Sequence, residues 1–182
     1  PVEQFLAAHY YPMRTLETAP QVRLIEFASV DAPDPYGLRW PETTTDLVYG
    51  DDIALVGFDL PRGETYAPGA ALPVSLVWQA GRALDTDYTI GVYLRAADGA
   101  PVAQVDAPPR WGFAPTTQWL PGVLIWDHRA LQLPPTLAPG DYQLWVKVYG
   151  FDANLQAQDL PVAGETTFDG VVGVLPVRIT IR

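Results

Sequence analysis

The residues that could act as nucleophiles, general bases or zinc ligands are few and far apart in this chain. Serine occurs only at Ser29 and Ser75, and histidine only at His9 and His128. Ser75 lies inside an alternating segment, whereas the nucleophile of many hydrolases sits on a sharp, glycine-flanked turn. The two histidines do not have the spacing of zinc ligands, and cysteine is absent. We therefore expect neither a serine-hydrolase site nor a zinc site.

Acidic residues are abundant, and some of them are neighbours in the sequence. The pairs Asp51/Asp52 and Asp85/Asp87 could in principle transfer protons or bind calcium, but a chain with 21 acidic residues has such pairs by chance. An Asp-x-Asp-x-Asp-Gly loop and a phosphate-binding glycine loop are both missing from the sequence. We expect these carboxylates to cap turns, and we expect a chain that is not an enzyme and needs no metal or cofactor.

Aromatic side chains offer a different chemistry, because their ring faces can stack on the C–H surface of a sugar. The segment 107–122 is rich in proline and glycine and is expected to be a loop. It combines large rings with polar partners that could orient a ligand: Arg110, Trp111, Phe113, Gln118 and Trp119. A second interpretation is open, in which Phe113 and Trp119 instead plug the end of a hydrophobic core.

A second group of aromatics lies on predicted strands. The segment 141–149 alternates, so Tyr142, Leu144, Val146 and Val148 are expected on one face and Gln143, Trp145, Lys147 and Tyr149 on the other. The same argument for 87–96 places Tyr93 on the face that carries Trp145 and Tyr149. This face is a candidate glycan-binding surface. Alternatively, the N-terminal segment with Phe5, Leu6, Tyr10 and Tyr11 folds back and covers it.

The elements that would position these side chains are mostly strands. Period-two patterns predict strands at 22–27, 53–60, 72–79, 87–96, 101–106, 123–133, 141–149 and 171–181. Dipeptides such as Pro68-Gly69, Asp98-Gly99 and Pro139-Gly140 supply the turns between them. Residues 3–11 are good helix formers that end at Pro12.

These patterns predict an all-β fold, an antiparallel β-sandwich of immunoglobulin-like or jelly-roll-like type with a short N-terminal helix. We expect an N-terminal segment at 1–46, packed on a sandwich domain at 47–182. The segment 31–46, rich in proline, aspartate and glycine, has the composition of a loop, and long loops are also expected at 107–122 and 150–170.

Composition limits the partners. The net charge is −10 with a single lysine, Lys147, so nucleic acid is not expected to bind. The hydrophobic fraction of 48% is typical of a folded globule. No apolar run approaches the roughly 20 residues that span a bilayer, so we expect a soluble fragment. The first residue is Pro1, which suggests a piece of a longer protein.

Several motifs, in order along most of the chain, resemble the C-terminal extracytoplasmic β domain of bacterial polytopic membrane glycosyltransferases of the dolichyl-phosphate-mannose-using type. The motifs are His9-Tyr10-Tyr11-Pro12, Gly50-Asp51-Asp52-Ile53, Leu76-Val77-Trp78-Gln79, Trp119 with Pro121-Gly122, and Pro139-Gly140-Asp141-Tyr142. They are turn and core signatures. The resemblance implies a parent whose catalytic residues lie between membrane helices that this chain lacks, so no catalytic residue is carried over.

Two hypotheses follow. In the first, the chain is a non-catalytic accessory domain on the extracytoplasmic face of the membrane, beside its parent transmembrane domain, and it binds glycan or lipid-linked sugar through Trp111, Trp119, Trp145, Tyr149, Tyr93, Arg110 and Gln118. In the second, it is a protein-interaction or spacer module without a small ligand. Solvent exposure of the six tryptophans distinguishes the two hypotheses, because rings that stack on a sugar must be exposed and rings that fill the core must be buried.

Overall fold

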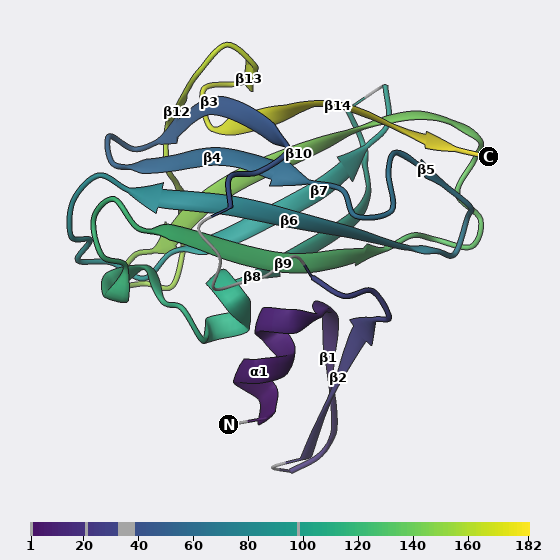
Figure 1. Ribbon diagram of the computed structural model, residues 1–182, viewed down its shortest axis with the longest axis horizontal. Coiled ribbons are helices and arrows are strands. Elements are labelled where there is room, and N and C mark those ends of the chain that lie inside the picture. The colour runs from purple at the N-terminus through teal and green to yellow at the C-terminus, as the bar shows by residue number, and fades with distance from the viewer. Residues whose placement is uncertain (1, 21, 33–38, 98) are drawn as a thin grey trace.

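Two β-sheets packed face to face form the body of the molecule, and a short helix and a β-hairpin lie against the outside of one sheet (Figure 1). The computed structural model describes residues 2–20, 22–32, 39–97 and 99–182. Within these residues, all strand pairs are antiparallel except the short β5–β14 pair. The predicted all-β sandwich with a short N-terminal helix is confirmed.

The first sheet has the strand order β12-β3-β4-β6-β9. Its strands are β3 (Thr43–Tyr49), β4 (Ile53–Asp59), β6 (Ala71–Ala80), β9 (Leu124–Gln132) and β12 (Val162–Ala163). The second sheet has the order β13-β14-β10-β7-β8. Its strands are β7 (Thr89–Arg95), β8 (Pro101–Ala107), β10 (Gly140–Phe151), β13 (Thr167–Phe168) and β14 (Val172–Ile181), with β5 (Thr65–Tyr66) beside β14 and β11 (Ala157–Asp159) beside β10.

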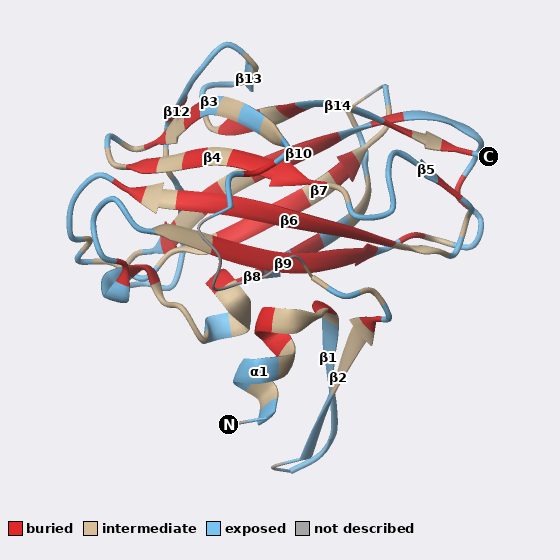
Figure 2. Cartoon of the chain, viewed as in Figure 1, coloured by how far each residue is buried: buried red, intermediate tan, exposed pale blue. Residues whose placement is uncertain are grey.

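The core lies between the sheets, and alternation along each strand explains which side chains enter it. In β10, Tyr142, Leu144, Val146 and Val148 are buried, as the period-two pattern predicts. They face residues of the first sheet such as Leu76. Figure 2 shows the buried residues concentrated along β6, β7, β9 and β10. The seven strands expected from 53 to 181 all form, with ends within two residues of the prediction.

The N-terminal unit consists of α1 (Val2–His9) and the hairpin of β1 (Tyr11–Ala19) and β2 (Val22–Ala28). It packs on the outer face of the first sheet, beside β9 (Figure 1). Tyr11 is fully buried there and, with Ala28 and Ala130, forms a small second core. The alternative in which this segment covers the face of Tyr93, Trp145 and Tyr149 is therefore wrong, because the segment lies on the other sheet.

Some elements were not expected from the sequence. Strand β1 was not predicted, and it begins at Tyr11, which was expected to belong to the helix. Strand β3 was not predicted either, and because it begins at Thr43 it crosses the expected boundary between residues 46 and 47. The segment 31–46 was expected to be a loop, and its residues 33–38 lie outside the described residues. The loop 107–122 contains two 3-10 turns, η1 (Pro109–Gly112) and η2 (Thr116–Gln118), and the loop 150–170 contains β11, β12 and β13.

Candidate functional site

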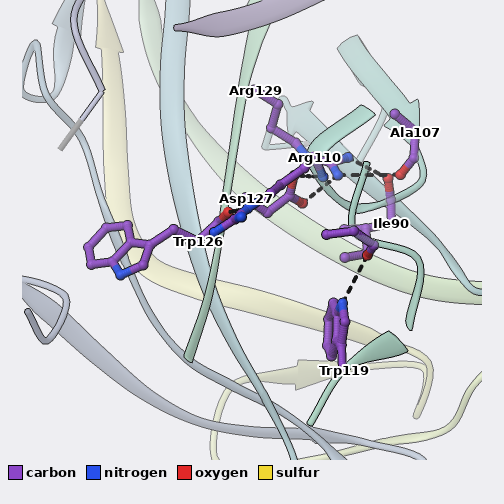
Figure 3. Close-up of polar contacts among 8 residues, drawn as sticks. Ile90, Ala107, Arg110, Trp119, Trp126, Asp127 and Arg129 are labelled. Carbon is purple, nitrogen blue, oxygen red and sulfur yellow. Dashed lines mark hydrogen bonds and ion pairs between the residues drawn. The ribbon is translucent and has the colours of Figure 1, made fainter. Parts of the chain in front are cut away.

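The residues predicted in the 107–122 loop separate into structural and exposed groups. Arg110 is held by backbone and side-chain contacts to β9: its N–H donates to Asp127 Oδ1 at 2.8 Å, and its Nε donates to the Trp126 carbonyl at 2.7 Å. Figure 3 shows Arg110 lying along β9 beside Asp127. Arg110 therefore anchors the loop to the sandwich.

Asp127 also belongs to a fully buried ion pair with Arg129 (Figure 3). Arg129 donates to Asp127 Oδ2 at 2.5 Å, to the Ile90 carbonyl at 2.6 Å and to the Ala107 carbonyl at 3.3 Å. The pair thus ties β9 of one sheet to β7 and β8 of the other. A buried charge needs such partners, because removing one of them leaves the other desolvated and uncompensated.

Trp119 belongs to the core. Its side chain is 3% exposed, and its Nε1 donates to the Ala114 carbonyl at 2.9 Å. An indole buried to this degree has no free face for a sugar, so Trp119 serves as the core plug that the second interpretation described. Gln118 lies exposed at the end of η2. Trp111 is partly exposed and donates from Nε1 to Thr15 Oγ1 of the hairpin at 3.1 Å.

The strand residues predicted for the site do come together. Trp145, Tyr149 and Tyr93 lie on the outer face of the second sheet, whereas the N-terminal unit packs mainly against β9 and β6 of the first sheet. We call this surface the aromatic face; it is formed by Tyr93, Arg95, Gln104, Asp106, Trp145, Lys147, Tyr149, Phe151 and Phe168.

Strand register sets the layout of the aromatic face. Trp145 of β10, Tyr93 of β7 and Gln104 of β8 are direct cross-strand partners and form one row. Lys147 and Asp106 belong to the next row, on either side of Gly91. The ring of Tyr93 leans over Gly91, where a Cβ would collide with the Tyr93 hydroxyl and with Asp106 Oδ1. A glycine at this position is therefore what allows Tyr93 to reach Asp106.

Asp106 is the polar centre of the aromatic face. Its Oδ1 accepts hydrogen bonds from the hydroxyls of Tyr93 at 2.8 Å and Tyr149 at 3.1 Å. Its Oδ2 accepts a longer bond, 3.3 Å, from Gln104. Burial, followed by the negative charge of Asp106, raises the pKa of Tyr149 to about 12 and raises the pKa of Tyr93 as well. Both hydroxyls therefore keep their protons at neutral pH and hold the carboxylate in place.

Trp145 is enclosed from two sides. The Arg95 guanidinium lies 4.3 Å from the centre of its ring, and the ring of Phe168 lies 4.7 Å away. These contacts leave the Trp145 side chain 7% exposed, so it supports the face more than it presents a free ring. A pocket of about 270 Å³ lies here, bounded also by Tyr93 and Lys147. Among the rings of the aromatic face, Phe151 and Phe168 are the most exposed to solvent, and Tyr93 and Tyr149 are partly exposed.

The structure also joins Ser75 to a histidine, which the sequence did not suggest. Ser75 Oγ lies 2.9 Å from His128 Nδ1 and 2.7 Å from the Tyr11 hydroxyl. All three side chains are fully buried between the first sheet and the N-terminal unit. In this position the chain of hydrogen bonds joins β1 to the sandwich and is closed to a substrate. In the described residues, no group of three or more acidic or histidine side chains could hold a metal ion.

Sequence reasoning missed Gln104, Asp106, Phe151 and Phe168 as members of the face. Gln104 and Asp106 alternate with the buried Val105, so the predicted strand 101–106 carried a signal for their shared face. No signal in the sequence indicated the pairing of β8 with β7, which brings Asp106 to Tyr93.

No protein-family model matches the chain, and no curated protein matches it at a significant level. None of the helices in the described parts of the chain has the length and apolar character that crossing a bilayer requires. The class of protein that the structure defines is an all-β sandwich with an added N-terminal helix and hairpin.

Proposed function

We propose that the chain is a non-catalytic carbohydrate-binding domain, displayed outside the membrane as part of a glycosyltransferase, and that the aromatic face binds the glycan. The observation that carries this proposal is the Asp106 carboxylate, held by two tyrosine hydroxyls among partly exposed rings on the outer face of the second sheet. Aromatic rings with a few fixed polar groups are the usual composition of a small-ligand site.

Each part of the face has a role in this proposal. The ring centres of Tyr149 and Phe151 lie 5.6 Å apart in an edge-to-face arrangement, and this contact fixes the orientation of the Tyr149 ring. Asp106 Oδ2, which is not engaged by the tyrosines, is the oxygen that a sugar hydroxyl would reach. Lys147 forms an ion pair with Asp159, and this pair supplies a donor and an acceptor at the border of the face.

The link to a membrane glycosyltransferase and to the extracytoplasmic side comes from the sequence resemblance. The substrates we propose are accordingly bacterial polysaccharides and lipid-linked sugars, with the parent transmembrane domain as partner. The acidic net charge of −10 is compatible with neutral sugars and unfavourable for nucleic acid.

The experiment is a titration of the chain with bacterial polysaccharides and lipid-linked sugars, followed by tryptophan fluorescence and by calorimetry. Trp40 is 60% exposed and precedes β3 in the first sheet, so a Trp40→Phe background removes the emission of the most exposed tryptophan, which lies outside the face. We expect saturable binding that Tyr149→Ala weakens about tenfold or more, from the loss of a stacking ring. The matched control is Phe5→Ala on α1, a half-exposed ring away from the face, which should bind normally. Unchanged emission and heat with every sugar would refute glycan binding.

A second candidate function is a spacer or protein-interaction module. Four of the six tryptophans are buried, namely Trp78, Trp119, Trp126 and Trp145, which favours a structural use of these rings. A co-purification of the parent transmembrane region with the chain, lost on Phe151→Asp and Phe168→Asp but insensitive to added glycan, would support this candidate over the first.

A further inference from the structure

A second hollow lies where the N-terminal hairpin meets the sandwich, and we call it the junction pocket. It has a volume of about 490 Å³. The hairpin contributes Met13, Arg14, Thr15 and Arg23, and the sandwich contributes Trp111 and the end of β8 with the following turn, residues 104–108. An apolar ring and a thioether beside amide, guanidinium and carboxylate groups form the mixed lining that small polar ligands use.

The junction pocket is continuous with the aromatic face. Gln104 and Asp106 line the pocket, and the same Asp106 accepts the hydroxyls of Tyr93 and Tyr149 on the face. Both residues belong to β8, the last strand of the second sheet. A ligand that leaves the aromatic face across β8 therefore enters the junction pocket directly.

Trp111 is held in an unusual way at this junction. Arg110 and Trp111 both have left-handed backbone conformations, with φ of 50° and 59°. Such residues are strained and persist only where surrounding contacts impose them. Two hydrogen bonds provide those contacts: the Arg110 backbone N–H donates to Asp127, and the Trp111 indole N–H donates to Thr15. The result is a partly exposed indole fixed at the wall of the pocket.

The guanidinium groups of the pocket are positioned by ion pairs on the hairpin side. Arg14 donates from Nε and Nη2 to the Glu26 carboxylate, at 2.6 and 3.1 Å, and Arg23 pairs with Glu3. Each cation is balanced by its own carboxylate, so the two arginines offer hydrogen-bond donors without a net positive charge. Sugar hydroxyls fit such donors better than a phosphate would.

We propose that the aromatic face and the junction pocket are two parts of one binding site for a linear, neutral oligosaccharide, with Trp111 stacking on a sugar unit beyond β8. This inference rests on the proposed function and specifies its substrate class. From β10 to β8 the sheet spans about 10 Å, at about 4.8 Å per strand, which a single sugar ring does not cover. The glycan is therefore a chain of several units that crosses the strands.

The test measures affinity as a function of chain length, by calorimetry, with linear gluco-, manno- and galacto-oligosaccharides from the monosaccharide to the hexasaccharide. For a sugar series that binds, affinity should rise as the chain reaches from the aromatic face to Trp111. Trp111→Ala should weaken the hexasaccharide about tenfold and leave the shortest binding oligosaccharide unchanged, whereas Trp111→Phe should retain most of the gain.

Thr15→Val is the control for hairpin docking, because it removes the partner of the Trp111 indole but keeps the ring. Its hexasaccharide affinity should fall less than that of Trp111→Ala, because the stacking ring remains although one of the contacts that fix it is lost. Thermal unfolding should report Trp111→Ala, Trp111→Phe and Thr15→Val as folded. If short and long chains bind equally, or if Trp111→Ala changes nothing, the extended site is refuted while glycan binding by the aromatic face stands. If no oligosaccharide or polysaccharide binds wild type, the proposed function fails and the extended site fails with it.

Discussion

Acid should loosen the attachment of the N-terminal unit through one buried histidine. His128 is fully buried beneath Tyr11. Its Nδ1 is hydrogen-bonded to Ser75 Oγ, and the centre of its ring lies 6.1 Å from that of Trp126. Burial first, and then the positive charges of Arg110 and His9, lower the pKa of His128 to about 3. In the unfolded chain the same imidazole has a pKa of about 6.5.

The sign and the size follow from these two values. Between about pH 6.5 and pH 3 the unfolded chain binds a proton at His128 that the folded chain does not, so stability falls as the pH is lowered. From about pH 7.5 to pH 5 the loss is about 2 kcal/mol. For a chain of this length, that corresponds to a decrease in Tm of about 4 to 8 °C.

The assay is urea unfolding at a series of pH values for wild type and for His128→Gln, which keeps a polar group of similar size without the titration. Carboxylates affect both proteins, so the difference in free energy of unfolding between the two isolates the histidine. Between about pH 7.5 and pH 5, we expect the wild type to lose about 2 kcal/mol more of its free energy of unfolding than the variant does. His9→Gln is the matched control and should keep the wild-type pH dependence, because His128 is still present.

Two results would refute this reasoning. The first is a wild-type pH dependence that His128→Gln leaves unchanged. The second is an NMR titration of the folded protein in which the His128 ring has a midpoint near its ordinary value, which would mean that the imidazole is not desolvated as the structure has it.

Two substitutions test the packing that positions the site. Gly91→Ala should displace Tyr93 from Asp106, because the new Cβ would collide with both side chains. We expect the free energy of unfolding in urea to fall by about 1 to 3 kcal/mol and glycan affinity to be lost. If stability and affinity are both unchanged, the layout of the aromatic face is contradicted. Asp127→Ala should lower the free energy of unfolding by about 3 to 5 kcal/mol, because Arg129 then stays buried without its partner. The matched variant Asp141→Ala breaks the exposed pair with Arg178 and should lower it by no more than about 1 kcal/mol. Equal losses of stability in the two variants would be inconsistent with our account.

Strong alternation made the strands of the sandwich predictable. The segment around Leu144, Val146 and Val148 places apolar groups on one face without exception, and the structure buries all three. Strand β3 was missed because it begins with Thr43, Thr44 and Thr45 followed by an aspartate, which has no apolar alternation. Strand β1 was missed because Pro12 indicated the end of a helix, whereas a proline is also tolerated near the start of an edge strand.

The candidate site was predictable only as far as local geometry determines it. The shared face of Tyr93, Trp145 and Tyr149 follows from strand period and pairing. The burial of Trp119 and the use of Arg110 as an anchor depend on where the 107–122 loop folds back onto β9, which residue types in a loop do not specify. The buried Arg129 could not be foreseen, since its partners come from β7, β8 and β9 together.

The central claim is that the aromatic face binds a glycan, and NMR of aromatic side chains during a titration tests it most directly. With the linear oligosaccharide series as probes, we predict saturable chemical-shift changes at Tyr93, Tyr149 and Phe151, with Trp111 joining them for long chains, and little change at Phe5 on α1. Spectra that stay the same with every sugar, or shifts confined to residues outside the aromatic face and the junction pocket, would contradict the account.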